Sequence, residues 1–177
     1  MPAKMDEIMT IANRYGIPVL EDAAEALGST YKGQACGTFG EYGVLSFNGN
    51  KMITTSGGGA LVTPTTETKQ RVMFYATQAR ENAPHYQHEV IGYNYRMSNV
   101  VAGVVRGQIP YLAEHVEKKK AIYMRYRDGL SDLPITMNPY DPDTMEPNFW
   151  LSCMLINADA MCKQERSDCT ATYQSES

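Results

Sequence analysis

Apolar positions near the start of the chain follow a helical spacing first and a strand-like run second. The first helix is predicted from apolar residues at helical intervals, namely Met5, Ile8, Met9 and Ala12. Gly16 stands where a left-handed residue would end this helix, and Pro18 prevents its continuation. Residues 17–20 then form an apolar run that ends in two carboxylates. Helix, tight turn and buried strand predict half of an α/β crossover unit.

Strands and helices continue to alternate along the chain. Apolar runs predict strands at 42–47 and 59–63, and a helix is expected at 67–80. A longer helical pattern covers 98–130. Pro110 is expected to kink or divide that helix, because proline lacks an amide proton and clashes with the preceding turn. This alternation is typical of an α/β fold.

The composition shifts after residue 130. A stretch rich in proline, aspartate and asparagine follows, and the apolar run 149–156 predicts a last strand. We therefore expect two parts, at residues 1–130 and 131–177.

Composition and charge narrow the classes of partner. The chain has 177 residues, of which 43% are hydrophobic, and its net charge is −4. These values indicate a folded protein without the basic surface that nucleic acid or an anionic membrane requires. No apolar stretch is long enough to span a bilayer, and the first ten residues carry acids where a signal peptide has its apolar core. We expect a cytoplasmic protein that acts on small molecules.

The four cysteines show no spacing typical of a metal site. They lie far from the three histidines and form no C-x-x-C pair, so we expect free thiols and no bound metal. They are Cys36, Cys153, Cys162 and Cys169.

Candidate chemistry follows the predicted strands. Asp22 ends the first strand, where α/β sheets bind ligands, although it could instead cap the turn that follows. Lys51 lies in the polar loop between the next two strands. A lysine that forms a Schiff base and a carboxylate that keeps a pyridine nitrogen protonated are the minimal equipment of a pyridoxal phosphate enzyme. Ser46 and the turn after it offer a hydroxyl and backbone amides to a phosphate.

Other interpretations of the same residues stay open. Most loop lysines only face solvent, and the glycines at 57–59 are also typical of a plain hairpin turn. The chain could be a non-catalytic module that folds only with a partner. A Rossmann dehydrogenase is disfavoured because its glycine motif follows a strand and opens a helix, whereas this glycine run precedes a strand.

Several motifs together resemble a known family. The motifs "EDAA", "SF-x-x-x-K" and "G-x-N-x-RM" occur in that order within 21–97. They closely resemble the DegT/DnrJ/StrS family of pyridoxal phosphate-dependent nucleotide-sugar aminotransferases, which have the type I, aspartate aminotransferase-like fold. The segment "SFNGNKMITTSGGGAL" is most similar to the corresponding segment of enzymes that aminate C4 of UDP-linked 4-keto-6-deoxy-N-acetylglucosamine. The resemblance covers nearly the whole chain.

The resemblance implies roles for five residues. Lys51 would be the Schiff-base lysine and the acid and base of proton transfer. Asp22 would pair with the pyridinium nitrogen and Ser46 would bind the phosphate. Asn94 would reach the phosphate in the partner subunit of a homodimer. Glu25 would lie near the phenolic oxygen, where many relatives have an amide and where a carboxylate requires one of the two groups to be protonated.

The resemblance also implies a reaction and a missing part. L-glutamate would leave its amine on the cofactor, and a nucleotide-linked keto sugar would then collect it. A lysine rather than a histidine at position 51 disfavours the family's sugar dehydratase branch. His85, Tyr86 and His88 would contact the sugar nucleotide or only face solvent, and Arg96 would hold the interface or an anion. Full-length members carry a further amino-terminal half, so residues 1–130 resemble the second half of the large domain and residues 131–177 the start of the small one.

Overall fold

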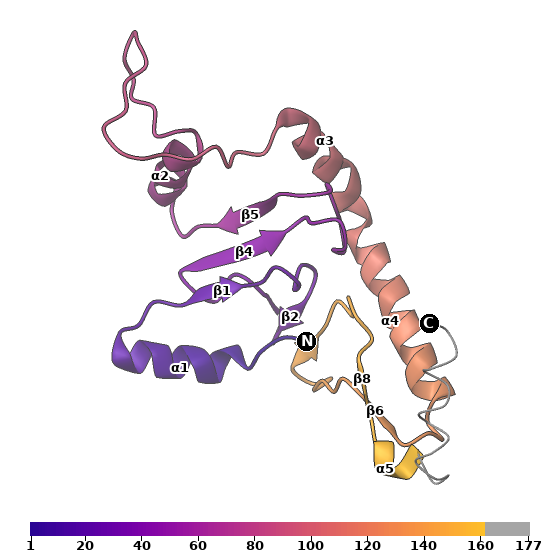
Figure 1. The fold of residues 1–177 in the computed structure, drawn as a ribbon. Helices are drawn as coiled ribbons and strands as arrows, with labels where there is room; N and C mark the ends of the chain where they lie inside the picture. Colours follow the sequence, from indigo (N-terminus) through magenta and orange to yellow (C-terminus); the bar gives the residue numbers. More distant parts are fainter. Residues whose placement is uncertain (162–177) are drawn as a thin grey trace.

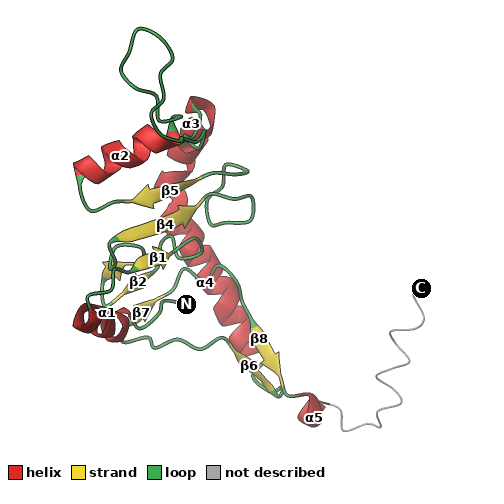
Figure 2. Ribbon diagram, turned by 60° about the vertical axis from the view of Figure 1, so that its left-hand side comes forward, coloured by secondary structure: helices red, strands yellow, loops and turns green. Residues whose placement is uncertain are grey.

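The computed structural model describes residues 1–161. Cys162, Cys169 and the rest of the expected second part from residue 162 onward lie outside the described residues. A helical rod, residues 99–129, runs along one side of a small central sheet. A long loop, residues 80–97, projects beyond the sheet at the opposite end from β6 and β8 (Figure 1). The turned view shows the same rod crossing behind the central strands (Figure 2).

The first helix forms and ends where the sequence predicts. Helix α1 spans Met5–Tyr15. Gly16 ends it in a left-handed conformation with φ of 63°, and the amides after the helix bond to the carbonyls of Ala12 and Asn13. The cap confirms the predicted boundary, since glycine adopts this conformation without a Cβ clash.

The first strand lies later in the chain than predicted. Strand β1 covers Leu20–Asp22 rather than 17–20, and Leu20 and Ile17 are 63% and 60% exposed. Pro18 cannot donate a ladder hydrogen bond, and the strand begins only where β4 pairs with it. Within the described residues β1 is an edge strand, which explains why its apolar side chains are not buried.

The central sheet frames the lysine loop. Its order is β1–β4–β5; β1 and β4 are parallel, and β4 and β5 are antiparallel. Strands β4 and β5 span Tyr42–Ser46 and Gly59–Val62, each ending one residue before its prediction. The loop between them holds Lys51 and is closed at its base, because Phe47 donates its amide to the carbonyl of Gly58.

Two smaller sheets lie beside the central one. Strand β2 (Thr30–Tyr31) pairs with both β3 (Gln34–Ala35) and β7 (Met145–Glu146). Strand β6 (Ile135–Met137) pairs with β8 (Met154–Ile156).

The last predicted strand is mostly irregular. Only Met154–Ile156 of the predicted run 149–156 is extended and paired. Phe149 has φ of 53°, a left-handed value that no strand residue adopts, and the Trp150 indole nitrogen donates to the carbonyl of Asn50 at 2.6 Å. The Trp150 side chain is thus bonded to the lysine loop, and the first part of the predicted strand forms no pairing with another strand.

The remaining helices follow the sequence signals closely. Helix α2 begins after the Thr65 cap and stops at Ala76, before the predicted end at residue 80, because Gln78 and Ala79 have positive φ values. Pro110 divides the long helix as predicted. Their bounds are α2 Thr66–Ala76, α3 Asn99–Gln108, the 3-10 turn η1 Ile109–Tyr111, α4 Leu112–Gly129 and α5 Ala158–Met161.

The buried core lies directly under the lysine loop. Ile53 is 1% exposed and clusters with Phe47 and Val105. The side chain of Gln108 also bonds to both backbone polar groups of Thr54. The loop is thus held against the rod of α3 and α4 by apolar packing and by hydrogen bonds.

An acidic side chain joins α1 to β2. Lys32 and Tyr31 both donate to the carboxylate of Asp6, the lysine at 2.5 Å. These hydrogen bonds, with Lys32 contributing most, lower the pKa of Asp6 to about 2.

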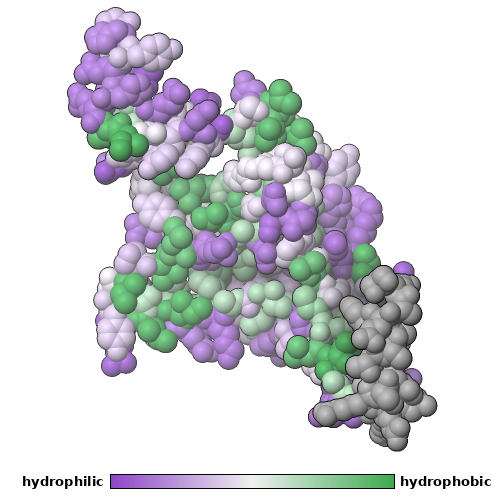
Figure 3. Space-filling model, in the orientation of Figure 1, coloured by the Kyte–Doolittle hydropathy of each residue, from purple (hydrophilic) through white to green (hydrophobic). Residues whose placement is uncertain are grey.

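Apolar side chains gather on the surface over α1 and β1 (Figure 3). The exposed ones there are Ile8, Ile11, Tyr15, Ile17 and Leu20. Within residues 1–161, no helix has the length and apolarity needed to cross a bilayer.

Candidate functional site

The Lys51 side chain is directed inward and is only 12% exposed. Its amine lies 3.2 Å from Oε1 of Glu25 and 4.4 Å from the centre of the Trp150 ring. A carboxylate and the face of an indole both stabilise a positive charge. The solvated loop lysine, one of the two interpretations left open by the sequence, does not describe this side chain.

Local hydrogen bonds shape the loop that carries the amine. The Lys51 amide donates to the carbonyl of Asn48 at 3.0 Å, which closes a tight turn. The Asn48 amide donates to Oγ of Ser46 at 3.2 Å. Because Ser46 acts as acceptor there, its hydroxyl hydrogen remains available to a further acceptor such as a phosphate oxygen.

The backbone of Glu25 is fixed by the side chain of Asn148. Asn148, which is 4% exposed, donates from Nδ2 to the carbonyls of Glu25 and Leu27 at 2.8 and 3.0 Å. Its Oδ1 accepts from the Trp150 amide at 3.0 Å. One buried amide therefore fixes both groups that contact the Lys51 amine.

Two hollows meet at Lys51 and Trp150. The first is too tight to hold a water molecule and is lined by Ala24, Glu25, Leu27, Ser46, Lys51, Met52, Asn148 and Trp150. The second, on the side of α4, has a volume of about 210 Å³ and is lined by Asn50, Lys51, Met52, His115, Lys118, Lys119, Ile122 and Trp150. His115 is fixed by a 3.1 Å hydrogen bond between Nδ1 and the carbonyl of Met52.

Asp22 lies at the end of β1, but none of its hydrogen bonds involves Lys51. Its Oδ1 accepts the amide of Ala24 at 3.2 Å, so it caps the turn, as the second interpretation expected. It is exposed and lines a separate hollow of about 330 Å³ with Glu21 and Cys36. In a pyridoxal ring the nitrogen and the aldehyde are on opposite sides, so groups that serve them need not touch.

Glu21 has a structural role in the same region. Its carboxylate accepts backbone amides from Gly37, Phe39 and Gly40 at 2.5 to 2.7 Å. This network fixes the loop before β4 against β1. Burial, together with the charge of Glu21, raises the pKa of the Cys36 thiol.

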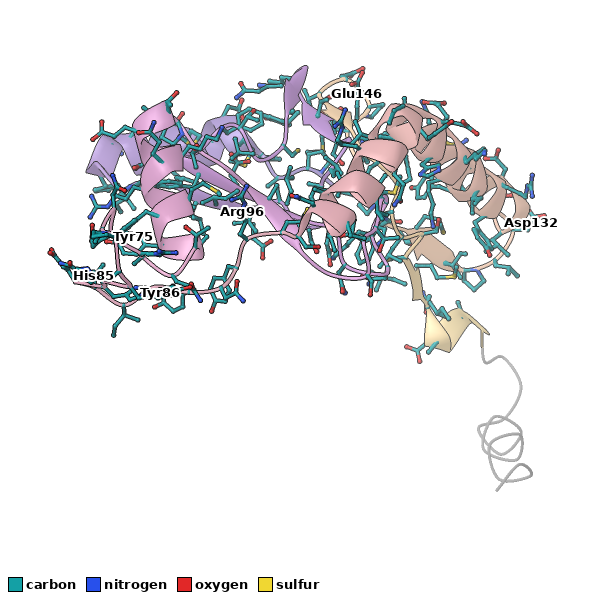
Figure 4. The ribbon with its side chains drawn as sticks, turned by 90° about the horizontal axis from the view of Figure 1, so that it is seen from above. Tyr75, His85, Tyr86, Arg96, Asp132 and Glu146 are labelled. Atoms are coloured by element: carbon teal, nitrogen blue, oxygen red, sulfur yellow. The ribbon has the colours of Figure 1, made fainter. Side chains whose placement is uncertain are left out.

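The remaining candidates lie on the projecting loop at 80–97 and line neither of the hollows at Lys51. His85, Tyr86 and Arg96 are exposed there, and Figure 4 shows His85 and Tyr86 together at one end of the molecule, with Arg96 nearer its middle. Asn94 is also exposed and makes an isolated bridge with Thr77. His88 contacts the carbonyl of Gln78 through Nδ1 at 2.9 Å. The structure therefore gathers Glu25, Ser46 and Lys51 but not the loop residues.

Sequence reasoning missed two residues of this site. Trp150 and Asn148 lie about a hundred positions from the residues they contact, and neither belongs to a recognisable motif. The one available signal was composition, because Trp150 is the only tryptophan in the chain.

An α/β sheet that presents a sheltered lysine beside a carboxylate and a serine hydroxyl defines a candidate pyridoxal phosphate enzyme. The model of the DegT/DnrJ/EryC1/StrS aminotransferase family matches residues 1–174, and the chain belongs to this family. Members of the family are pyridoxal phosphate-dependent enzymes. The predicted fold class, a partial type I aminotransferase fold, is confirmed.

Several curated relatives align with three quarters of the chain or slightly less. EpsN of Bacillus subtilis (strain 168), to which a pyridoxal phosphate-dependent aminotransferase activity is ascribed, is 55% identical over 131 residues, covering 74% of this chain and 34% of EpsN. GDP-perosamine synthase of Escherichia coli O157:H7 is 38% identical, covering 75% and 36%. UDP-4-amino-4,6-dideoxy-N-acetyl-beta-L-altrosamine transaminase of Campylobacter jejuni is 34% identical, covering 70% and 33%.

Solved aminotransferases share the architecture. TlmJ from Streptoalloteichus hindustanus superposes with a TM-score of 0.83 at 27% identity, covering 89% of this chain and 43% of TlmJ. DesV from S. venezuelae superposes with a TM-score of 0.79 at 30% identity, covering 97% and 45%. The chain thus spans about a third of the curated relatives and less than half of these structures.

The groups around Lys51 suit pyridoxal phosphate chemically. They comprise an amine for the aldehyde, a free hydroxyl hydrogen for the phosphate and a nearby carboxylate that can exchange a proton with the amine. The space between them is the part that does not yet suit a ring, since it is closed by Trp150.

Proposed function

We propose that these residues are part of a nucleotide-sugar aminotransferase that uses Lys51 as its Schiff-base lysine. The observation that carries the proposal is the sheltered Lys51 amine, 3.2 Å from Glu25 and close to the Ser46 hydroxyl, in a chain of this family. Pyridoxal phosphate, when bound, supplies the electron sink for the reaction.

Lys51 first has to become a nucleophile. Its amine gives up a proton to the Glu25 carboxylate at 3.2 Å, which leaves a neutral amine and a carboxylic acid. A protonated Glu25 also removes the repulsion between its carboxylate and the cofactor's phenolic oxygen. Lys51 Nζ then serves as the acid and base that moves the proton at the amine-bearing carbon.

The other residues position the cofactor. Ser46 would donate its hydroxyl hydrogen to the phosphate, and Asp22, at the carboxyl end of β1, would keep the ring nitrogen protonated. Asn94, which is exposed, would reach the phosphate in the partner subunit of a homodimer, as the family resemblance implies. His85, Tyr86, His88 and Arg96 are proposed to lie near the sugar nucleotide or the interface by the same argument.

We assign L-glutamate as amino donor and a nucleotide-linked keto-deoxy sugar as acceptor, as the family resemblance implies. The sequence of the 46–61 segment favours UDP-linked 4-keto-6-deoxy-N-acetylglucosamine. The names of two relatives describe amino sugars, one linked to GDP and one to UDP. The alternative is a non-catalytic module that folds only with a partner, supported by the short span of the chain relative to its relatives.

Borohydride trapping tests the proposal. The wild-type chain is mixed with excess pyridoxal phosphate, reduced and digested, and we expect one labelled peptide that contains Lys51. Lys51→Arg abolishes this label, whereas the matched control Lys69→Arg, at an exposed lysine of α2, leaves it unchanged. A folded wild-type chain that shows neither absorbance nor label favours the module instead.

A further inference from the structure

Trp150 forms the common wall of the two hollows beside Lys51. The hollow on the Ser46 side has no room for a water molecule, whereas the one on the α4 side has about 210 Å³. Cofactor and ligand sites typically need roughly 300 Å³ or more. Neither hollow alone is therefore large enough for a cofactor ring next to the amine.

Two polar contacts hold the Trp150 ring beside Lys51. Its indole nitrogen donates to the carbonyl of Asn50 at 2.6 Å, and the Lys51 amine lies over its ring at 4.4 Å. The residue belongs to an irregular segment between β7 and β8. Its backbone, in contrast, is anchored by Asn148.

We propose that Trp150 is a positioning residue that covers the Lys51 amine and swings toward the α4-side hollow to admit an aldehyde. The proposal rests on the assignment of Lys51 as the reactive amine. The α4-side hollow can receive the indole, because it has free volume and an apolar lining from Met52 and Ile122. Movement of the ring joins the two spaces into one that faces Ser46 and Lys51.

The covered state places two groups against the amine, with the centre of the indole ring at 4.4 Å and the Glu25 carboxylate at 3.2 Å. Withdrawal of the ring leaves the Glu25 carboxylate as the remaining one of these two contacts. Trp150 therefore controls access to the amine.

The first test measures the amine without any cofactor. Chains are treated with limiting acetic anhydride, and acetylation of Lys51 is compared with that of Lys69, an exposed lysine of α2, by peptide mapping. We expect Trp150→Ala to raise the rate at Lys51 about tenfold and to leave Lys69 unchanged. Trp150→Phe keeps a ring but loses the hydrogen bond to Asn50, so an intermediate rate is expected. Equal acceleration at both lysines, as a merely structural defect would give, overturns the proposal.

The second test uses the fluorescence of this single tryptophan and needs no substitution of it. Lys51→Met removes the charge from the indole face and should change the emission maximum or yield, whereas Lys69→Met, at an exposed position of α2, should not. Emission that does not respond to Lys51→Met also overturns the proposal.

Trapping with pyridoxal phosphate separates the two proposals. Faster acetylation of Lys51 in Trp150→Ala without any trapped cofactor supports the cover and contradicts the assigned function. Trapping at the same rate in wild type and Trp150→Ala, with unchanged acetylation, supports the function and overturns the cover.

Discussion

The lysine loop and the projecting loop at 80–97 carry candidate residues in opposite ways. The lysine loop rests on Ile53, which is 1% exposed, and is bonded to the helical rod through Gln108. In the projecting loop Ile91 and Tyr86 are 82% and 76% exposed. The first loop builds its chemistry within the chain, whereas the second presents its residues outward.

The difference follows from what lies beneath each loop. Buried apolar contacts give a segment its local stability, and a segment without them opens at little cost in free energy. A charged or aromatic side chain on such a segment acquires a fixed position only when another surface covers it. The contrast applies to the outer part of the projecting loop, because the backbone amides of Tyr93, Tyr95 and Arg96 donate to carbonyls at the end of α2.

Matched isoleucine substitutions should give the largest difference in stability between the two loops. We expect Ile53→Ala to lower the free energy of unfolding by about 2 to 5 kcal/mol, because it leaves a cavity under the lysine loop. Ile91→Ala removes the same atoms from an exposed site and should change it by less than about 0.5 kcal/mol. Urea unfolding followed by circular dichroism measures both. Similar losses in the two variants contradict the contrast between the loops.

Asn148 gives the next largest effect. Asn148→Ala leaves the carbonyls of Glu25 and Leu27 and the amide of Trp150 without their partner. We expect a loss of about 2 to 4 kcal/mol in the free energy of unfolding, together with a change in Trp150 emission. Asn82→Ala, at an exposed position, is the control. Unchanged emission in a destabilised Asn148→Ala chain contradicts the role of Asn148 in holding the site.

The smallest expected effect is the pH dependence of folding stability that Asp6 contributes. The folded-state pKa of Asp6, about 2, is below its ordinary value of 3.8, so its contribution to stability is present above pH 3.8 and is lost as the pH falls toward 2. Asp6→Asn should flatten this part of the pH dependence. Thermal unfolding between these pH values measures it, and parallel profiles for wild type and variant contradict the prediction.

Local signals in the sequence predicted the fold well where a single residue dictates the backbone. Gly16 ends α1 with a left-handed conformation, and Pro110 divides α3 from α4. The strands were less predictable, because β1 begins where β4 pairs with it rather than where its apolar run begins. Register depends on a partner strand that the local pattern does not reveal.

The motif resemblance pointed to five residues, and the structure places three of them, Glu25, Ser46 and Lys51, around one hollow. Asp22 and Asn94 do not line it. Asn148 and Trp150 were missed because their partners lie roughly a hundred residues away. Such pairings arise from tertiary packing, which hydrophobic periodicity does not encode.

The exposed apolar surface over α1 and β1 has a practical consequence for work on the purified chain. In the described part of the chain β1 pairs on one side only, so its other side offers unpaired amides and carbonyls beside Leu20. Strand edges of this kind can pair with another chain at high protein concentration. Yields of trapped cofactor should therefore be compared at several dilutions and normalised to the monodisperse fraction.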